Sequence, residues 1–167
     1  AVLLRVLELG VDLNIDNFQE FERVRAMADR IDGRSSIGFR LNPQVGAGSI
    51  DAMSTATPSS KFGVALEDPG NREALIDCYR GNVWLNSVHV HVGSQGCSLE
   101  MMAEGVRKAA ELAEEIDAAI GHRQVETIDI GGGLPVNFDS DDVTPTFADY
   151  AAVLRERAPV LFSGDYR

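Results

Sequence analysis

The feature that most constrains the fold is the alternation of short apolar segments with longer amphipathic ones. The pattern predicts strands at residues 11–15, 36–41, 84–91 and 125–130, separated by helices at residues 17–31, 69–80 and 99–120, with a last helix from Thr144 and Pro145 onward. Strands that alternate with helices of this length are typical of βα units in a parallel sheet. Four units are about half of an eight-stranded (β/α) barrel, which takes ~250 residues. The sequence therefore predicts an α/β fold, either a partial (β/α)8 barrel of about four units or an open flavodoxin-like sheet.

Capping residues and apolar spacing set the limits of the helices. The segment at residues 99–120 is the clearest helix, because its apolar side chains recur at three- and four-residue steps and Gly121 follows as a stop signal. Asp16 or Asn17 is expected to cap the first predicted helix. The stretch at residues 42–60 is rich in Gly, Ser, Thr and Pro, which predicts a long loop.

Charge and composition exclude several classes of function. The chain has 26 acidic and 15 basic residues and a net charge of −11, and such a negative surface repels nucleic acids and anionic membranes. The sequence has no run of apolar residues long enough to span a membrane and no signal-peptide pattern at its start, so we expect a cytoplasmic protein. Cys78 and Cys97 lack CxxC spacing and are expected to be free thiols. We therefore expect neither nucleic acid nor membrane as a partner.

Strand alternation predicts a polar face on one side of the sheet. Successive side chains of a strand point to opposite faces, so His89 and His91 share one face with Ser87, while valines occupy the other. The same rule places Arg40 and Asp129 on the polar side of their strands. In a barrel this side is the interior, and His91 lies nearest the carboxyl end, where such barrels place their active sites. Buried polar groups are costly unless paired, which favours a ligand or a hydrogen-bonded network, for example Asp129 holding His91 or Arg40.

Three successive glycines, Gly131, Gly132 and Gly133, follow the last predicted strand. Without side chains at these positions, main-chain N–H groups can converge on an anion, and phosphate is the natural guest. The triplet alone is weak evidence, since glycines also form tight strand exits and its spacing does not match GxGxxG or a P-loop. Ser94 lies three residues after His91, so its hydroxyl is expected to reach the same phosphate while the imidazole covers a flat ring.

Several segments resemble, in the same order, those of one family. They are the strand and helix start at residues 10–20, Phe-Arg-Leu-Asn-Pro at residues 39–43, Ser-Lys-Phe-Gly at 60–63, His-Val-Gly-Ser-Gln at 91–95 and Asp-Ile-Gly-Gly-Gly at 129–133. The last two are the most specific. The chain resembles the fold-type III decarboxylases that depend on pyridoxal 5'-phosphate (PLP), which include diaminopimelate, ornithine and arginine decarboxylases.

The resemblance implies an alanine-racemase-like barrel that binds PLP and gives each candidate residue a role. His91, the catalytic candidate, would stack on the pyridine ring of the cofactor, and Arg40 would lie near the ring, paired with Asp16. Ser94 and the three glycines would bind the cofactor phosphate. The implied reaction is the decarboxylation of a small amino acid, in which PLP accepts the electrons of the breaking bond and the protein supplies orientation and electrostatics. The resemblance also implies a homodimer and no metal ion.

The resemblance further implies parts of the family that this sequence does not contain. The lysine that binds the cofactor lies on the family's first barrel strand, which would precede Ala1, and the glutamate that pairs with the pyridine nitrogen lies in a Glu-Pro-Gly-Arg-like motif beyond the last helix. Lys61 matches a different family lysine, and Lys108 lies on a helix face that we expect to be solvated. Residues 1–167 are thus expected to form a single partial PLP-binding barrel domain without the first strands and the C-terminal β-domain, inactive by itself.

Two other functions fit parts of the pattern. A metal-dependent hydrolase would use His89 and His91 as zinc ligands from one strand, together with carboxylates such as Asp129 or Asp16. A non-catalytic PLP-binding module would keep the phosphate site without the lysine and would bind PLP reversibly. No substrate is predicted, because Gln95 resembles the diaminopimelate pattern while the residues after the glycines resemble the ornithine pattern.

Overall fold

A computed structural model of the chain describes residues 2–31, 35–46, 56–57, 60–93 and 95–167. Within these residues, parallel strands form a sheet in the order β1-β2-β4-β5, and β3 pairs with the end of β2. The strands are β1 (Leu13–Ile15), β2 (Ile37–Asn42), β3 (Val64–Ala65), β4 (Ser87–Val90) and β5 (Thr127–Asp129). The helices are α1 (Val2–Leu9), α2 (Phe18–Arg25), α3 (Asn71–Gly81), α4 (Leu99–Ile120) and α5 (Phe147–Arg157), with short 3-10 turns at Ala28–Arg30 and Pro159–Phe162.

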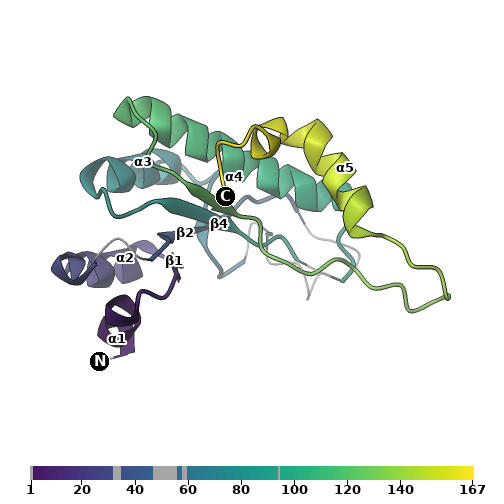
Figure 1. The fold of residues 1–167 in the computed structure, drawn as a ribbon, viewed down its shortest axis with the longest axis horizontal. Coiled ribbons are helices and arrows are strands. Elements are labelled where there is room, and N and C mark those ends of the chain that lie inside the picture. Colours follow the sequence, from purple (N-terminus) through teal and green to yellow (C-terminus); the bar gives the residue numbers. More distant parts are fainter. Residues whose placement is uncertain (1, 32–34, 47–55, 58–59, 94) are drawn as a thin grey trace.

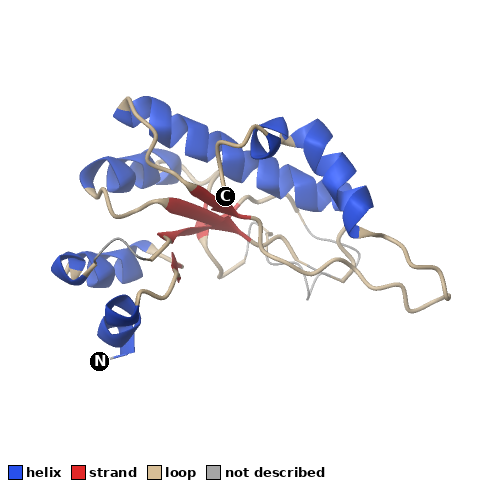
Figure 2. Cartoon of the chain, viewed as in Figure 1, coloured by secondary structure: helices blue, strands red, loops and turns tan. Residues whose placement is uncertain are grey.

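The helices cover the apolar side of the sheet. Figure 1 shows α3, α4 and α5 along one side of the strands, with α1 and α2 near β1, and Figure 2 shows the strands as a layer beneath the long helices. Phe39 of β2 lies in the core, with its ring centroid 5.4 Å from that of Phe21 on α2 and 6.2 Å from that of Tyr79 on α3. The alternating valines of β4, Val88 and Val90, are fully buried. The predicted division of the strands into an apolar side and a polar side is confirmed.

The sheet is curved, with its polar side on the inside of the curve. The Nδ2 atom of Asn14 on β1 lies 3.4 Å from Oδ2 of Asp129 on β5, although β2 and β4 separate these two strands. Neighbouring strands lie ~4.8 Å apart, so a flat sheet would hold β1 and β5 ~14 Å apart. Side chains of two residues meet across that span only if the sheet bends toward them. This curvature is that of a partial barrel and not of the open flavodoxin-like sheet.

Local capping explains where two of the helices begin and end. The Asn17 side chain accepts a hydrogen bond from the Glu20 N–H group and caps α2, as one of the two predicted capping residues. Helix α4 occupies the predicted residues 99–120. At its start the Ser98 hydroxyl accepts a hydrogen bond from the Met101 N–H group, and at its end Gly121 forms a left-handed C-cap with φ of 84°. Cys78 and Cys97 form no disulfide within the described residues, in agreement with the sequence analysis.

Two predicted helix boundaries are wrong. The helix predicted at residues 17–31 ends at Arg25, because Met27 has φ of −120°, outside the helical range, and a separate 3-10 turn follows. The last helix begins at Phe147 and not at Pro145. Thr146 and Asp149 cap it reciprocally, each side chain accepting a hydrogen bond from the other's main-chain N–H group.

The sequence analysis did not predict α1 or the two-residue strand β3. The predicted loop at residues 42–60 lies largely outside the described residues. The strands are also shorter than predicted, since β4 covers Ser87–Val90 instead of residues 84–91. No helix in the described part of the chain combines the length and the apolar character that crossing a membrane requires.

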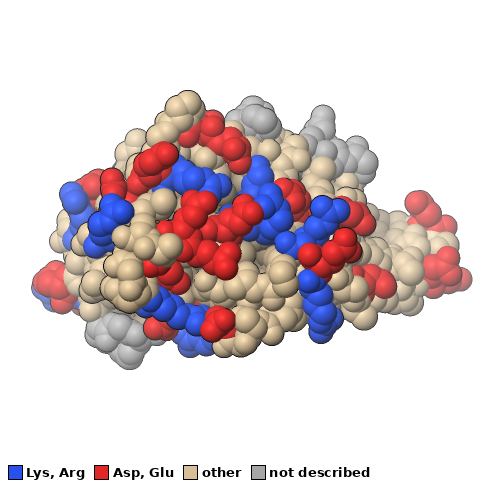
Figure 3. All heavy atoms as spheres, turned by 90° about the horizontal axis from the view of Figure 1, so that it is seen from above, with Lys and Arg blue, Asp and Glu red and all other residues tan. Residues whose placement is uncertain are grey.

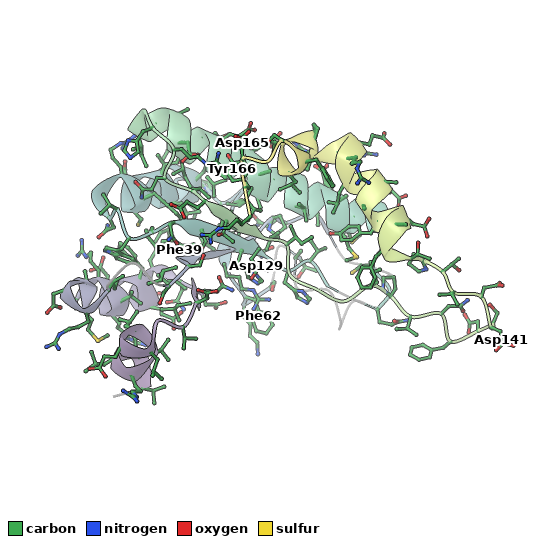
Figure 4. All side chains as sticks on the ribbon, in the orientation of Figure 1. Phe39, Phe62, Asp129, Asp141, Asp165 and Tyr166 are labelled. Atoms are coloured by element: carbon green, nitrogen blue, oxygen red, sulfur yellow. The ribbon has the colours of Figure 1, made fainter. Side chains whose placement is uncertain are left out.

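The helix side of the molecule carries charges of both signs (Figure 3). On α4, Arg107 forms ion pairs with Glu104 and Glu111. The loop between β5 and α5 projects from the body of the molecule (Figure 1), and Figure 4 labels Asp141 at its tip. The exposed charges there are acidic, since residues 139, 141 and 142 are all aspartates.

Candidate functional site

The polar side chains selected from the sequence lie in a row across adjacent strands. The register of β2 and β4 pairs Arg40 with His89, and the register of β4 and β5 pairs His89 with Asp129. Partners in a parallel ladder project to the same face, so the three side chains are neighbours on the inside of the curve. Figure 4 shows Asp129 on the side of the sheet away from α4 and α5, with Phe62 below it.

Asp129 contacts His89 directly, and not His91 or Arg40, which were the expected examples of its partner. Its Oδ2 atom lies 2.9 Å from Nδ1 of His89, because the register makes His89 its direct neighbour on β4. At this distance the carboxylate is within reach of an N–H group on Nδ1 of His89, and that nitrogen is buried. The imidazole of His89 is only 13% exposed.

The other carboxylate oxygen of Asp129 binds the glycine turn that follows β5. Its Oδ1 atom accepts a hydrogen bond of 2.9 Å from the N–H group of Gly131. Burial alone would raise the pKa of Asp129, but the Gly131 hydrogen bond, the positive charge that His89 can carry and the Asn14 amide together hold it below its usual range. Asp129 is therefore a carboxylate at neutral pH.

Arg40 lies between an acid and an aromatic ring. Its side chain is 21% exposed, and its Nη1 atom lies 4.0 Å from Oδ1 of Asp16, the pairing implied by the resemblance. Its guanidinium carbon lies 4.8 Å from the ring centroid of Phe62, within the range of a cation–π contact. Asp16 also accepts a hydrogen bond of 3.1 Å from the N–H group of Gly63. The sequence analysis did not give Phe62 or Gly63 a role, although the Ser-Lys-Phe-Gly segment that contains them was a usable signal.

His91 is half-buried at the carboxyl end of β4. Its Nδ1 atom accepts a hydrogen bond of 3.4 Å from the N–H group of Gly132, at the long end of the range. Burial lowers the pKa of His91, and the nearby charges of Arg40 and His89 lower it further, while Asp129 opposes them. His91 therefore presents a neutral ring at neutral pH.

The glycine turn after β5 needs a glycine at one position and leaves space at the next. Gly131 has φ of +70°, and a Cβ atom there would lie 2.6 Å from the carbonyl oxygen of Val90 and 2.9 Å from Nδ1 of His91. A Cβ atom at Gly132 would meet nothing within 4 Å. Gly133 has φ of +93°. The N–H groups of Gly131 and Gly132 donate to side chains in this structure, and Ser94 lies outside the described residues.

The two lysines lie in different surroundings. The prediction that Lys108 is solvated is wrong: its side chain is 17% exposed, and its Nζ atom lies 2.7 Å from Oε1 of Glu67 and 2.9 Å from the carbonyl oxygen of Pro43. Lys108 thus ties α4 to the end of β2. Lys61 is exposed, with its Nζ atom 5.3 Å from the ring centroid of Phe62.

His89 and His91, the zinc ligands of the hydrolase alternative, do not lie in a group of metal-binding side chains within the described residues. In the part of the chain that the structure describes, no three side chains of His, Cys, Asp and Glu lie close enough together to hold a metal ion. The register pairs His89 with Asp129, and His91 accepts a hydrogen bond from the glycine turn. No described contact favours the hydrolase alternative.

Gln95, for which no contact in the site was predicted, lies in the loop after β4 and links that loop to the one after β5. Its Nε2 atom donates to the carbonyl oxygen of Val136, and its Oε1 atom accepts from the N–H group of Val136, both at 2.8 Å. The side-chain amide thus pairs with a peptide unit as a second strand would. The loop after β4 is thereby fixed to the base of the projecting loop after β5.

The fold and the site together define a class of protein, the α/β barrels that carry a polar site at the carboxyl ends of their parallel strands. This chain forms a curved, partial barrel of that kind. The family model for the pyridoxal-binding domain of pyridoxal-dependent decarboxylases matches residues 1–167. The chain belongs to this family of PLP-dependent carboxy-lyases, and the part it represents is the domain that binds pyridoxal.

Individual relatives agree with the family assignment. The chain is 33% identical over 159 residues to the diaminopimelate decarboxylase of Pseudomonas fluorescens and 30% identical over 158 residues to that of Pseudomonas aeruginosa, in each case with 92% of this chain and 36% of the relative covered. Among solved structures, it is similar to Helicobacter pylori diaminopimelate decarboxylase in complex with L-lysine, with a TM-score of 0.75 and 26% identity, covering 98% of this chain and 40% of the other. The chain thus spans little more than a third of the length of the curated relatives it matches.

Proposed function

We propose that this chain is part of a longer PLP-dependent decarboxylase that removes a carboxylate from diaminopimelate, and that residues 1–167 hold one part of its cofactor site. The observation that carries the proposal is that Arg40, His91 and the turn at Gly131 meet at the carboxyl ends of adjacent parallel strands. In barrels of this kind, the active site is built at that end. The diaminopimelate substrate rests on the relatives named above.

The residues present fit pyridoxal phosphate. The cofactor combines a flat ring with an anionic group. His91 offers a half-buried neutral imidazole, Arg40 offers a positive charge that Asp16 balances only at 4.0 Å, and Gly132 leaves open space where a side chain would stand. By this proposal His91 lies against the cofactor ring, while Ser94 and the turn of Gly131, Gly132 and Gly133 surround the phosphate. The N–H groups of Gly131 and Gly132 donate to Asp129 and His91, so the N–H group of Gly133 is the one that donates to the phosphate.

Bound PLP supplies an electron sink for the bond that breaks, and the chain supplies placement and charge. A neutral His91 covers the ring without adding a second positive charge beside Arg40. Asp129 stays ionised and holds the turn from which the phosphate-binding backbone begins. The curved sheet excludes water from the apolar side of this site because Val88 and Val90 are fully buried behind it.

Neither lysine of this chain is placed to bind the cofactor covalently in the proposal. Lys108 is held by Glu67 and Pro43 on the helix side of the sheet, and Lys61 is exposed beside Phe62. A polypeptide of these residues alone is therefore expected to bind PLP reversibly and to release no carbon dioxide. We further propose that the remaining strands, the C-terminal β-domain and a second subunit complete the site.

The test uses the whole protein and the 167-residue polypeptide side by side. Each is incubated with PLP and with diaminopimelate, ornithine, arginine or lysine, and carbon dioxide release is measured. The whole protein should decarboxylate diaminopimelate and be labelled with a pyridoxyl group after borohydride reduction, while the polypeptide should show neither effect. Absence of turnover by the whole protein on all four amino acids would contradict the proposal and favour a non-catalytic PLP-binding module. Light scattering of the whole protein tests the dimer.

A further inference from the structure

A chain of contacts leads from Asp129 to His91 through the glycine turn. Asp129 Oδ1 accepts a hydrogen bond of 2.9 Å from the N–H group of Gly131, and the next N–H group, that of Gly132, donates to Nδ1 of His91 at 3.4 Å. Residues 129 to 132 are consecutive, so the conformation that the carboxylate imposes on Gly131 also sets the direction of the next N–H bond. The charge of Asp129 also acts on His91, but its link to the imidazole through hydrogen bonds runs through this turn.

The turn is held tightly on its other sides. The φ of +70° at Gly131 is open to glycine, and the missing Cβ atom would stand within 3 Å of Nδ1 of His91 and of the carbonyl oxygen of Val90. A side chain at position 131 would therefore collide with the imidazole. A turn in this position leaves the ring of His91 little freedom to rotate or to change the nitrogen that accepts.

We propose that Asp129 is a positioning residue: through the turn at Gly131 and Gly132 it fixes His91 as the tautomer with its proton on Nε2. This inference deepens the proposed function, on which it rests, because it explains how the imidazole that lies against the cofactor is oriented. A neutral imidazole has one donor and one acceptor nitrogen, and a main-chain N–H group that donates to Nδ1 leaves the proton on Nε2. The lowered pKa of His91 supports the neutral form.

The charged groups around the turn act on it in different ways. His89 and the Asn14 amide approach the other oxygen of Asp129, Oδ2, at 2.9 and 3.4 Å. They hold the carboxylate in place but do not face the turn. The charges of Arg40 and His89 favour the neutral form of His91 and that of Asp129 opposes it, and none of the three charges chooses between the two ring nitrogens. We therefore attribute the choice of tautomer to the hydrogen bonds that run from Asp129 through the turn, and not to the charges around His91.

Nitrogen NMR of the whole protein, labelled with 15N-histidine and kept free of cofactor, tests this assignment. In the wild type, His91 should show an unprotonated Nδ1 and a protonated Nε2. Asp129→Asn keeps an acceptor oxygen for Gly131 and should retain that pattern. Asp129→Ala removes the acceptor, and its Nδ1 resonance should shift toward the protonated position. Asn14→Ala, which loses only the Oδ2 contact, is the matched control and should match the wild type.

A protonated Nδ1 in the wild type would by itself overturn the proposal. The proposal can therefore be tested even if a variant fails to fold. An unchanged tautomer in folded Asp129→Ala, or a changed one in Asp129→Asn, would also overturn it. PLP titration of the same samples separates this inference from the proposed function. Asp129→Ala should bind PLP more weakly than Asp129→Asn. If the wild type does not bind PLP, the proposed function fails while the NMR result still decides the role of Asp129.

Discussion

The hydroxyl of Tyr79 donates a hydrogen bond to the carbonyl oxygen of Ser87, although Tyr79 lies on α3 and Ser87 begins β4. The same hydroxyl accepts a hydrogen bond of 3.2 Å from the N–H group of Phe39 on β2. A helix side chain therefore bridges the main chains of two neighbouring strands. Arg40 directly follows Phe39 on β2, and His89 lies two residues after Ser87 on β4. The bridge therefore lies directly behind the candidate site.

Removing that hydroxyl should destabilise the protein. Tyr79 is fully buried, and Tyr79→Phe leaves a buried N–H group and a buried carbonyl without their bridge. We expect the free energy of unfolding to fall by about 1–3 kcal/mol, measured by urea denaturation. Tyr150→Phe is the matched control, because Tyr150 is also buried but its hydroxyl makes no hydrogen bond in the described residues. This substitution should change the free energy of unfolding by less than ~0.5 kcal/mol. Equal effects of the two substitutions would contradict the bridge.

The glycine turn should tolerate a methyl group at one position and not at its neighbour. Gly131→Ala places a Cβ atom 2.6 Å from the carbonyl oxygen of Val90 at a φ of +70°. The left-handed conformation alone costs ~1–2 kcal/mol for a residue with a Cβ atom, and the overlap adds to it. Gly132→Ala meets nothing within 4 Å and should be close to wild type in stability. Thermal unfolding of both variants decides the point, and a stable Gly131→Ala protein would show that the turn has another conformation.

Acidification should weaken the fold through His91. Burial, assisted by Arg40 and His89, lowers the pKa of His91 in the folded protein below the value of about 6.5 for an unfolded histidine. Between those two values the unfolded chain binds more protons, so the free energy of unfolding should fall as pH drops below about 6.5. His91→Gln should flatten this dependence, while His122→Gln, which removes an exposed imidazole, should keep it. A wild-type slope in His91→Gln would assign the dependence to another group.

The alternation of strand side chains was sufficient to predict which residues share the polar face. Arg40, His89 and Asp129 alternate with apolar neighbours, and a period of two leaves no other assignment. Their pairing was not predictable, because it depends on the register between strands. That register sets His89 and not His91 beside Asp129. Contacts between distant segments escape sequence reasoning in the same way, as Lys108 illustrates, since its partners lie 65 and 41 residues away in the chain.

Gln95 should control the projecting loop between β5 and α5. Its two hydrogen bonds with Val136 hold the base of this loop, and Phe138 beyond it is 79% exposed. Gln95→Glu replaces the donor with a carboxylate oxygen that faces the Val136 carbonyl, so the base should open and chymotrypsin should cleave after Phe138 several-fold faster. Gln19→Glu, an exposed change of the same kind on α2, is the control. Equal cleavage rates in both variants would show that Gln95 does not hold the loop.

We propose that the carboxyl ends of β2, β4 and β5 form a PLP site. The most direct measurement is a crystal structure of the whole protein with bound PLP. It should place the phosphate against the turn of Gly131, Gly132 and Gly133 and the cofactor ring against the imidazole of His91, with Arg40 beside it. PLP bound elsewhere on the protein, or a ring out of contact with His91, would contradict the claim.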